Sequence, residues 1–234
     1  MRNKPVVYFR YLPNADYYET WNLQEQLLQQ IVKIKLNNRN KKIPDTTPNY
    51  LLFCEHPHVY TLGKNGKKEH LLLNENELQK IGATFVPINR GGDITYHGKG
   101  QLVGYPILNL DYFSTDLHLY MRNLEEVIIL TLQEYGIEGY RIPKLTGVWV
   151  NVQGQPKKIA AFGVRCSHWV TMHGFAFNLN TDLKYFEYII PCGIQDKGVT
   201  SLAEVLQEKV NEEVAQKIVL QKFEKVFDCI IEYE

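Results

Sequence analysis

Residues 90–110, RGGDITYHGKGQLVGYPILNL, carry the strongest structural signal in the chain. The second half of this segment, Leu102–Leu110, is rich in strand-forming residues but alternates poorly between apolar and polar side chains. Such a pattern is typical of a strand that is covered on both faces. The segment therefore predicts a strand in the interior of a sheet.

The first half of the segment is a glycine-rich loop. It does not fit the phosphate-binding loop, because Gly92 and Gly98 have five residues between them and Lys99 precedes Gly100 rather than Ser or Thr. The dinucleotide fingerprint is absent as well. Glycine is used where a Cβ would block a close backbone approach, so the loop passes close to another group, which is either a ligand or the core beneath a bulged hairpin. Its polar members are denser than a plain turn needs: Arg90, Asp93, Thr95, Tyr96, His97 and Gln101.

Strand and helix signals alternate irregularly along the rest of the chain. The segment Asp116–Tyr135 fits a helix with Gly136 at its C-terminal end, and Ser201 with Glu204 forms a capping-box pattern. Few strands are joined by regular βαβ crossovers, so the chain is predicted to be one α+β domain over 1–234 with a mixed sheet. Further strands are predicted at 6–10, 50–54, 59–62, 84–88, 148–152, 157–166 and 173–180, and further helices around Leu23, Leu27, Ile31 and Ile34 and, from Asn211 onward, along Val219, Phe223, Val226, Phe227 and Ile230.

The composition excludes several classes of protein. Hydrophobic residues make up 44% and charged residues 22%, which is typical of a globular chain. The 26 Lys and Arg balance the 26 Asp and Glu, which argues against a protein that coats nucleic acid. No stretch approaches the roughly 18 apolar residues of a membrane span, and no signal peptide is evident. We expect a cytoplasmic monomer that binds neither nucleic acid nor membrane.

Two short segments are candidates for covalent chemistry. Cys192 lies between Pro191 and Gly193, a context that indicates an accessible thiol in a turn, although a small apolar residue in a tight turn is an equal alternative. Lys157 and Lys158 are adjacent in a strand pattern, so they point to opposite faces and one of them can reach a partly buried site. The alternative is that both are exposed charges on an edge strand.

The remaining cysteines and the histidines give weaker signals. The four cysteines show no CxxC spacing, and Cys54, Cys166 and Cys229 fit core positions. His56 and His58 form an H-x-H pair, but Pro57 favours a turn with ordinary hydrogen bonds, and we predict no metal site. His97 and His173 each precede a glycine, which suits residues that line a cleft.

Taken together, these motifs resemble the octanoyl (lipoyl) transferases that modify lipoyl domains. The resemblance rests on RGGDITYHGKGQLVGYPILNL and on an ordered series of further blocks, and it spans about residues 50–202. Lys99 departs from the family pattern, which usually has proline in Gly-Pro-Gly-Gln. The other blocks are Glu55-His56-Pro57, Lys158-Ile-Ala-Ala-Phe-Gly163, His173-Gly174-Phe175-Ala176, Pro191-Cys192-Gly193 and Gly198-Val-Thr-Ser-Leu202.

The resemblance implies a fold, a reaction and residue roles. The implied fold is the mixed sheet flanked by helices of biotin and lipoate ligases. The implied reaction moves an octanoyl group from the phosphopantetheine thiol of acyl carrier protein to a lysine of lipoyl domains, in 2-oxoacid dehydrogenases and the glycine cleavage H protein, with no cofactor. By resemblance, Cys192 carries the acyl thioester and Lys158 is its base. The implied substrate-binding residues are Arg90, Gly91, Gly92, Asp93, Ile94, Thr95, Tyr96, His97, Ala161, Phe162, Gly163, Gly174, Phe175 and Ala176. Because an octanoyl chain needs a dry site, we expect an apolar tunnel whose wall candidates are Tyr96, Leu102, Phe162 and Phe175.

Two alternatives remain open at this point. A lipoate–protein ligase shares the fold and a glycine-rich loop, but it activates the free acid with ATP and needs no cysteine nucleophile. A non-catalytic relative that only docks lipoyl domains is the second alternative. Pro191-Cys192-Gly193 and the Tyr96-His97-Gly98 loop argue against the ligase, and the simultaneous presence of Cys192 and Lys158 argues against the non-catalytic relative.

Overall fold

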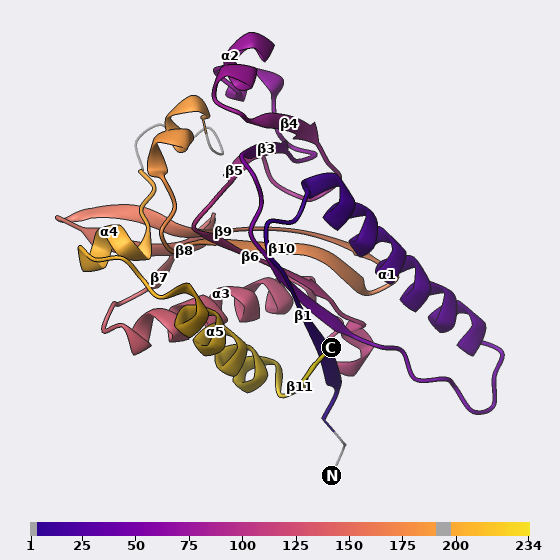
Figure 1. Ribbon diagram of the computed structural model, residues 1–234. Coiled ribbons are helices and arrows are strands. Elements are labelled where there is room, and N and C mark those ends of the chain that lie inside the picture. Colours follow the sequence, from indigo (N-terminus) through magenta and orange to yellow (C-terminus); the bar gives the residue numbers. More distant parts are fainter. Residues whose placement is uncertain (1–3, 191–197) are drawn as a thin grey trace.

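The computed structural model describes residues 4–190 and 198–234 and is built around one large mixed sheet (Figure 1). The strands at one edge run parallel to one another, and the remaining neighbours are antiparallel. The order across the sheet is β11 (Ile230–Tyr233), β1 (Val6–Leu12), β2 (Tyr50–Cys54), β6 (Gln101–Ile107), β10 (Val170–Asn178), β9 (Gln155–Ser167), β8 (Leu145–Val152) and β7 (Tyr140–Ile142).

A second, smaller sheet lies at one end of the first (Figure 1). Two of its strands flank residues 88–93, where the glycine-rich loop begins. Its central strand β3 pairs in parallel with β4 and antiparallel with β5. The short helix α2 (Glu75–Lys80) begins with a capping box at Asn74 and leads into β4. The bounds of the three strands are Val59–Leu62 for β3, Thr84–Pro87 for β4 and Ile94–His97 for β5.

Helices cover both faces of the large sheet. Helix α1 (Tyr17–Asn38) packs against one face through Leu27, Leu28 and Ile31. Helices α3 (Leu117–Glu134) and α5 (Glu212–Phe227) pack against each other and cover the opposite face (Figure 1). No helix within 4–190 or 198–234 is long and apolar enough to cross a membrane. The short helices are η1 (Lys68–His70), η2 (Leu110–Tyr112), η3 (Leu183–Tyr188) and α4 (Leu202–Leu206).

The central strand and the long helices confirm the strongest sequence predictions. Every residue of β6 is buried, as expected for a strand covered on both faces. Asp116 caps α3 by accepting hydrogen bonds from the first turn, and Gly136 follows the helix with a φ of 69°. Ser201 caps α4 by accepting from the Glu204 backbone N–H. The predicted mixed α+β class is therefore confirmed. It could be predicted because the signals for these strands and helices lie within short segments of the sequence.

Two features differ from the sequence-based expectation. The loop between β5 and β6 does not close a hairpin, because these two strands belong to different sheets. Ile230 was expected on the last helix, but it is exposed in the edge strand β11, which pairs in parallel with β1. Helix α5 ends earlier because Asp228 adopts a left-handed conformation with a φ of 48°. Apolar spacing alone did not mark that break.

Candidate active site

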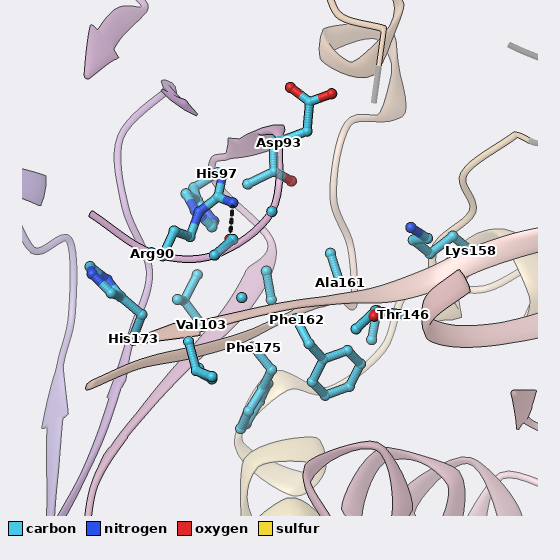
Figure 2. Close-up of a pocket in the computed structure, with 18 of the residues that line it drawn as sticks. Arg90, Asp93, His97, Val103, Thr146, Lys158, Ala161, Phe162, His173 and Phe175 are labelled. Atoms are coloured by element: carbon cyan, nitrogen blue, oxygen red, sulfur yellow. Dashed lines mark hydrogen bonds between the residues drawn. The ribbon is translucent and has the colours of Figure 1, made fainter. Parts of the chain in front are cut away.

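A cavity of about 540 Å³, here called the main cavity, lies between the glycine-rich loop and strands β9 and β10. Arg90, Asp93 and His97 lie on one side of these strands, whereas the rings of Phe162 and Phe175 lie on the other (Figure 2). The cavity brings together most of the predicted substrate-binding residues: Arg90, Gly91, Gly92, Asp93, Ile94, Thr95, His97, Ala161, Phe162, Gly163, Gly174, Phe175 and Ala176, together with Lys158.

Glycines allow the loop to rest directly on the strands. The Gly91 N–H donates to the Val164 carbonyl at 2.9 Å. A Cβ on Gly163 would lie 2.9 Å from the Gly91 carbonyl oxygen, and one on Gly174 would lie 2.2 Å from the Gly104 carbonyl oxygen. Both distances are shorter than Cβ atoms tolerate, so these positions need glycine because of close backbone approaches. Glycine at 163 therefore lets the loop approach β9, and glycine at 174 lets β10 lie close to β6.

Arg90 holds the loop in place from inside the protein. Its side chain is 8% exposed, and its guanidinium donates to the Thr61 carbonyl at 2.8 Å and to Thr61 Oγ1 at 3.0 Å. A second nitrogen donates to the Gly91 carbonyl at 3.0 Å. Three residues further on, Asp93 accepts from the Ile94 N–H and contacts His70 Nδ1 at 2.6 Å. These contacts hold residues 90–93 against β3 and η1.

Lys158 lies at one end of the main cavity, beside Thr146 (Figure 2). Its Nζ sits 4.8 Å from the centroid of the buried Trp149 ring. Its stem passes Gly147, where a Cβ would come within 3.0 Å of Lys158 Cε. The β8–β9 register shifts between Val148 and Trp149, and Trp149 is the strand partner of Lys158. Gly147 itself is held by the fully buried Glu125, whose carboxylate accepts from the Gly147 N–H at 3.1 Å.

The neighbouring lysine has a different environment. Lys157 Nζ pairs with Glu204 at 3.2 Å and does not line the main cavity. The two lysines therefore differ as strand alternation predicts, and the structure selects Lys158 as the one at the cavity. The Lys158 backbone also bonds to the chain after the predicted nucleophile, because its N–H donates to the Gly198 carbonyl and its carbonyl accepts from the Thr200 N–H, each at 2.9 Å. Cys192 itself lies outside the described residues.

The other cysteines are placed as predicted or nearly so. Cys54 and Cys229 are buried, and Cys166 on β9 is half-buried. Burial raises the pKa of all three thiols, which keeps them protonated and unreactive at neutral pH. None of these three lines the main cavity.

Some sequence expectations fall outside the cavity. The Tyr96 ring stacks on Tyr185 at 5.0 Å inside the small sheet's core, and its hydroxyl bonds His58 Nδ1 at 2.7 Å, so it does not line the cavity. Leu102 faces the α3 side of the large sheet and is also absent from the lining. Lys99, the departure from the family pattern, is exposed and does not reach the cavity.

Several lining residues were missed by sequence reasoning. Tyr17 comes from the start of α1, and Leu117 and Met121 come from α3, far from the glycine-rich loop in sequence. These residues carry apolar signals that are identical to those of core residues, so their role follows only from the tertiary fold. The others include Val103, Tyr105, Lys144, Leu145, Ala160, Val164, Asn178, Phe186 and Val199.

Three buried histidines surround the Arg90 end of the cavity. Burial lowers the pKa of His56 to about 4 and those of His97 and His173 to about 3. His97 Nδ1 donates to Gln101 at 2.8 Å, and His56 bonds Tyr105 at 2.8 Å and the Ala15 carbonyl at 2.7 Å. All three rings are therefore neutral at physiological pH. Within the described residues, no group of three or more His, Cys, Asp or Glu is arranged to hold a metal ion.

These histidines predict an acid-sensitive fold. Their folded pKa values lie below the unfolded value of about 6.5, so the unfolded state binds more protons as the pH falls below that value. The contribution of these neutral histidines to the free energy of unfolding is fully present above about pH 6.5. It decreases toward pH 4, by on the order of 1 kcal/mol per pH unit for each histidine. Urea unfolding at pH 7 and pH 5 measures this slope. His97→Gln should flatten it, whereas the exposed His118→Gln should not; equal slopes in both variants would contradict the assignment.

Comparisons with known proteins agree with this site and fold. Residues 16–224 match the family model of the lipoyl protein ligase A/B catalytic domain. The octanoyltransferase of Flavobacterium psychrophilum is 59% identical over 223 residues, which cover 94% of this chain and 96% of that protein. The octanoyltransferase of Christiangramia forsetii is 55% identical over 228 residues, which cover 96% of this chain and 97% of that protein.

Solved structures show the same fold at low sequence identity. A bipartite lipoate protein ligase from Thermoplasma acidophilum, part of an archaeal lipoylation system, has a TM-score of 0.68 at 16% identity, over 100% of this chain and 86% of that one. Lipoate-protein ligase A bound with ATP has a TM-score of 0.68 at 15% identity, over 99% of this chain and 88% of that one. The predicted resemblance to lipoate ligase folds is thereby confirmed. The chain belongs to the octanoyltransferase family, whose acyltransferases are built on the lipoyl protein ligase A/B catalytic domain.

Proposed function

We propose that this protein transfers an octanoyl group from the phosphopantetheine thiol of acyl carrier protein to a lysine of lipoyl domains. The acceptors are lipoyl domains of 2-oxoacid dehydrogenases and the glycine cleavage H protein. The observation that carries the proposal is the position of Lys158 at one end of a largely apolar cavity, with its backbone bonded to the chain that follows Cys192. An acyl chain needs such a dry cavity, and a thioester exchange needs such a base.

In the first half-reaction, the Cys192 thiol gives its proton to Lys158 and attacks the carrier's thioester. The phosphopantetheine thiolate leaves and takes the proton from Lys158. A free thiol with a pKa of about 8.5 is only a few per cent thiolate at neutral pH, so a neighbouring base is needed. One thioester replaces another, and the exchange therefore needs no ATP.

In the second half-reaction, the acceptor lysine amine attacks the thioester on Cys192. The amine loses a proton to Lys158 as the amide forms, and the departing Cys192 thiolate receives that proton. One base thus serves both half-reactions. Backbone N–H groups near Cys192 or along 161–163 would stabilise the oxyanion in each.

The carrier protein needs a basic surface near the cavity. Arg90 is buried and Arg165 is paired with Glu25. Lys64, Lys67 and Lys68 are exposed, and the Lys64 N–H donates to the Arg90 carbonyl at 3.0 Å, so these lysines flank the glycine-rich loop. We therefore assign carrier docking to the loop that contains them. We also propose that the protein acts as a monomer in the cytoplasm.

A transfer assay without ATP tests the proposed reaction. Purified protein is mixed with octanoyl-acyl carrier protein and a lipoyl domain, and the mass of the lipoyl domain is followed over time. We expect one octanoyl group on one lysine, at a rate that ATP does not change. Transfer that requires ATP and free octanoate would instead identify a lipoate–protein ligase, the activity suggested by the shared fold.

A further inference from the structure

Glu125 on α3 is a fully buried carboxylate that takes no part in the two half-reactions. A carboxylate in a protein interior is strongly unfavourable unless other groups pair with it and satisfy its oxygens. A helix that only packed against the sheet would place an apolar side chain at such a position. The partners of Glu125 therefore indicate what the carboxylate does there.

The two oxygens of Glu125 have different partners. Oε2 accepts from Arg141 Nε and pairs with Arg122 Nη1, each at 2.9 Å. Oε1 accepts from the Gly147 N–H at 3.1 Å. Arg141 is in turn held on α3, because its Nη2 donates to the Arg122 carbonyl at 2.8 Å and to Glu126 at 2.7 Å. Glu125 thus connects Gly147 on β8 to two arginines, one on α3 and one on β7.

Gly147 lies where β8 departs from regular pairing. Its φ is 141°, in the region that favours glycine, and the β8–β9 pairing starts one residue later at Val148, just before the register shifts. The N–H of Gly147 has the buried carboxylate as its acceptor. Glu125 therefore stabilises an irregular part of the strand that the sheet ladder alone does not hold.

The side chain of Lys158 lies directly against Gly147. A Cβ on Gly147 would come within 3.0 Å of Lys158 Cε and 3.3 Å of its Cδ, so the lysine occupies the space that a side chain at 147 would fill. The amine continues to the Trp149 ring, whose centroid lies 4.8 Å from Nζ. A displacement of Gly147 would therefore displace the lysine, whose amine lines the main cavity.

We propose that Glu125 is a positioning residue for the transfer reaction. It holds Gly147 in the conformation that directs the Lys158 amine into the main cavity, and Arg122 and Arg141 hold Glu125. The inference rests on the proposed function for the role of Lys158 as the base. Glu125 does not itself line the main cavity, so it acts through Gly147 and Lys158 and not on the substrate.

Glu125→Gln tests this connection with a side chain of the same size. Its amide has one accepting oxygen and an NH2 group that only donates, so it cannot accept from Gly147 and from the arginines at the same time. We expect kcat for octanoyl transfer to fall about 10- to 100-fold, the size of loss that a small misplacement of a catalytic group causes. KM for the carrier should stay within about threefold of wild type, because carrier docking does not involve α3.

A double-mutant cycle separates positioning from a general loss of structure. In a Lys158→Met background the base is already absent, so adding Glu125→Gln should lower transfer by less than about twofold. Glu126→Gln is the matched control, because it removes another carboxylate partner of Arg141 but leaves the Gly147 contact intact, and it should transfer like wild type. Losses that multiply in the double variant would show that Glu125 acts on the fold and would overturn the inference.

A measurement on the resting protein needs no transfer. The Trp149 ring shifts the NMR signal of the Lys158 ε-methylene, which is assigned in ¹³C-lysine-labelled protein by its loss in Lys158→Met. Glu125→Gln should move this signal, whereas Glu126→Gln should leave it in place. An unmoved signal in Glu125→Gln would reject the inference even where octanoyl transfer is found. A moved signal without octanoyl transfer would support the inference and contradict only the proposed function.

Glu125→Asp tests the same connection if Glu125→Gln does not fold. Aspartate keeps the charge that pairs with Arg122 and Arg141, which preserves the buried ion pair. It is shorter by one methylene, so it cannot reach from these arginines to the Gly147 N–H. We expect a lower kcat and a moved Lys158 signal in this variant as well. Wild-type values of both would overturn the inference.

Discussion

Serine in place of Cys192 is expected to remove nearly all octanoyl transfer, by roughly a thousandfold or more. A serine hydroxyl keeps the size of the side chain but is far less readily ionised than a thiol, so Lys158 cannot generate the nucleophile. The loss should appear in kcat, because binding of the carrier and of the acyl chain does not depend on the sulfur.

Cys166→Ser provides the matched control for this variant. Cys166 is half-buried on β9, and it does not line the main cavity, so the same chemical change there should leave transfer close to wild type. Comparable rates for Cys192→Ser and wild type, measured by mass of the acylated lipoyl domain, would remove Cys192 from the mechanism.

Methionine in place of Lys158 is expected to lower transfer by roughly 10²- to 10⁴-fold, the usual contribution of a general base. Methionine keeps most of the length of the side chain along Gly147 and Trp149 while it removes the amine. The fold should survive, because Glu125 still holds Gly147. The loss should be greater in kcat than in KM.

Lys157→Met is the matched control for this second prediction. Lys157 is the adjacent residue on the same strand, and its partner is Glu204 on α4 rather than any group of the main cavity. We expect transfer by Lys157→Met to stay within a few-fold of wild type. Equal losses in the two variants would assign the effect to β9 as a whole and would contradict a specific role for Lys158.

Local patterns predicted the elements better than their partners. The burial of β6 and the bounds of α3 follow from residue types within each segment, and both predictions are confirmed. The separation of β2 and β3 into two sheets was not predictable, because both read as short apolar strands and the difference lies in their distant partners, β6 and β5.

The same limit applies to the site. Glycines and polar residues of the loop mark it in the sequence because they break ordinary turn patterns. Tyr17, Tyr105 and Met121 line the cavity with side chains that are indistinguishable from core residues in sequence. Tyr96 was expected at the site because it belongs to the motif, yet its ring packs in the small sheet. The choice between Lys157 and Lys158 needed the register of β8 and β9.

The most direct test of the central claim is the intact mass of the protein itself after mixing with octanoyl-acyl carrier protein in the absence of ATP. We predict a gain of one octanoyl group that hydroxylamine removes and that Cys192→Ser does not acquire. An unmodified protein that nevertheless acylates the lipoyl domain would contradict the thioester route, and acylation that appears only with ATP and free acid would contradict the proposed reaction as a whole.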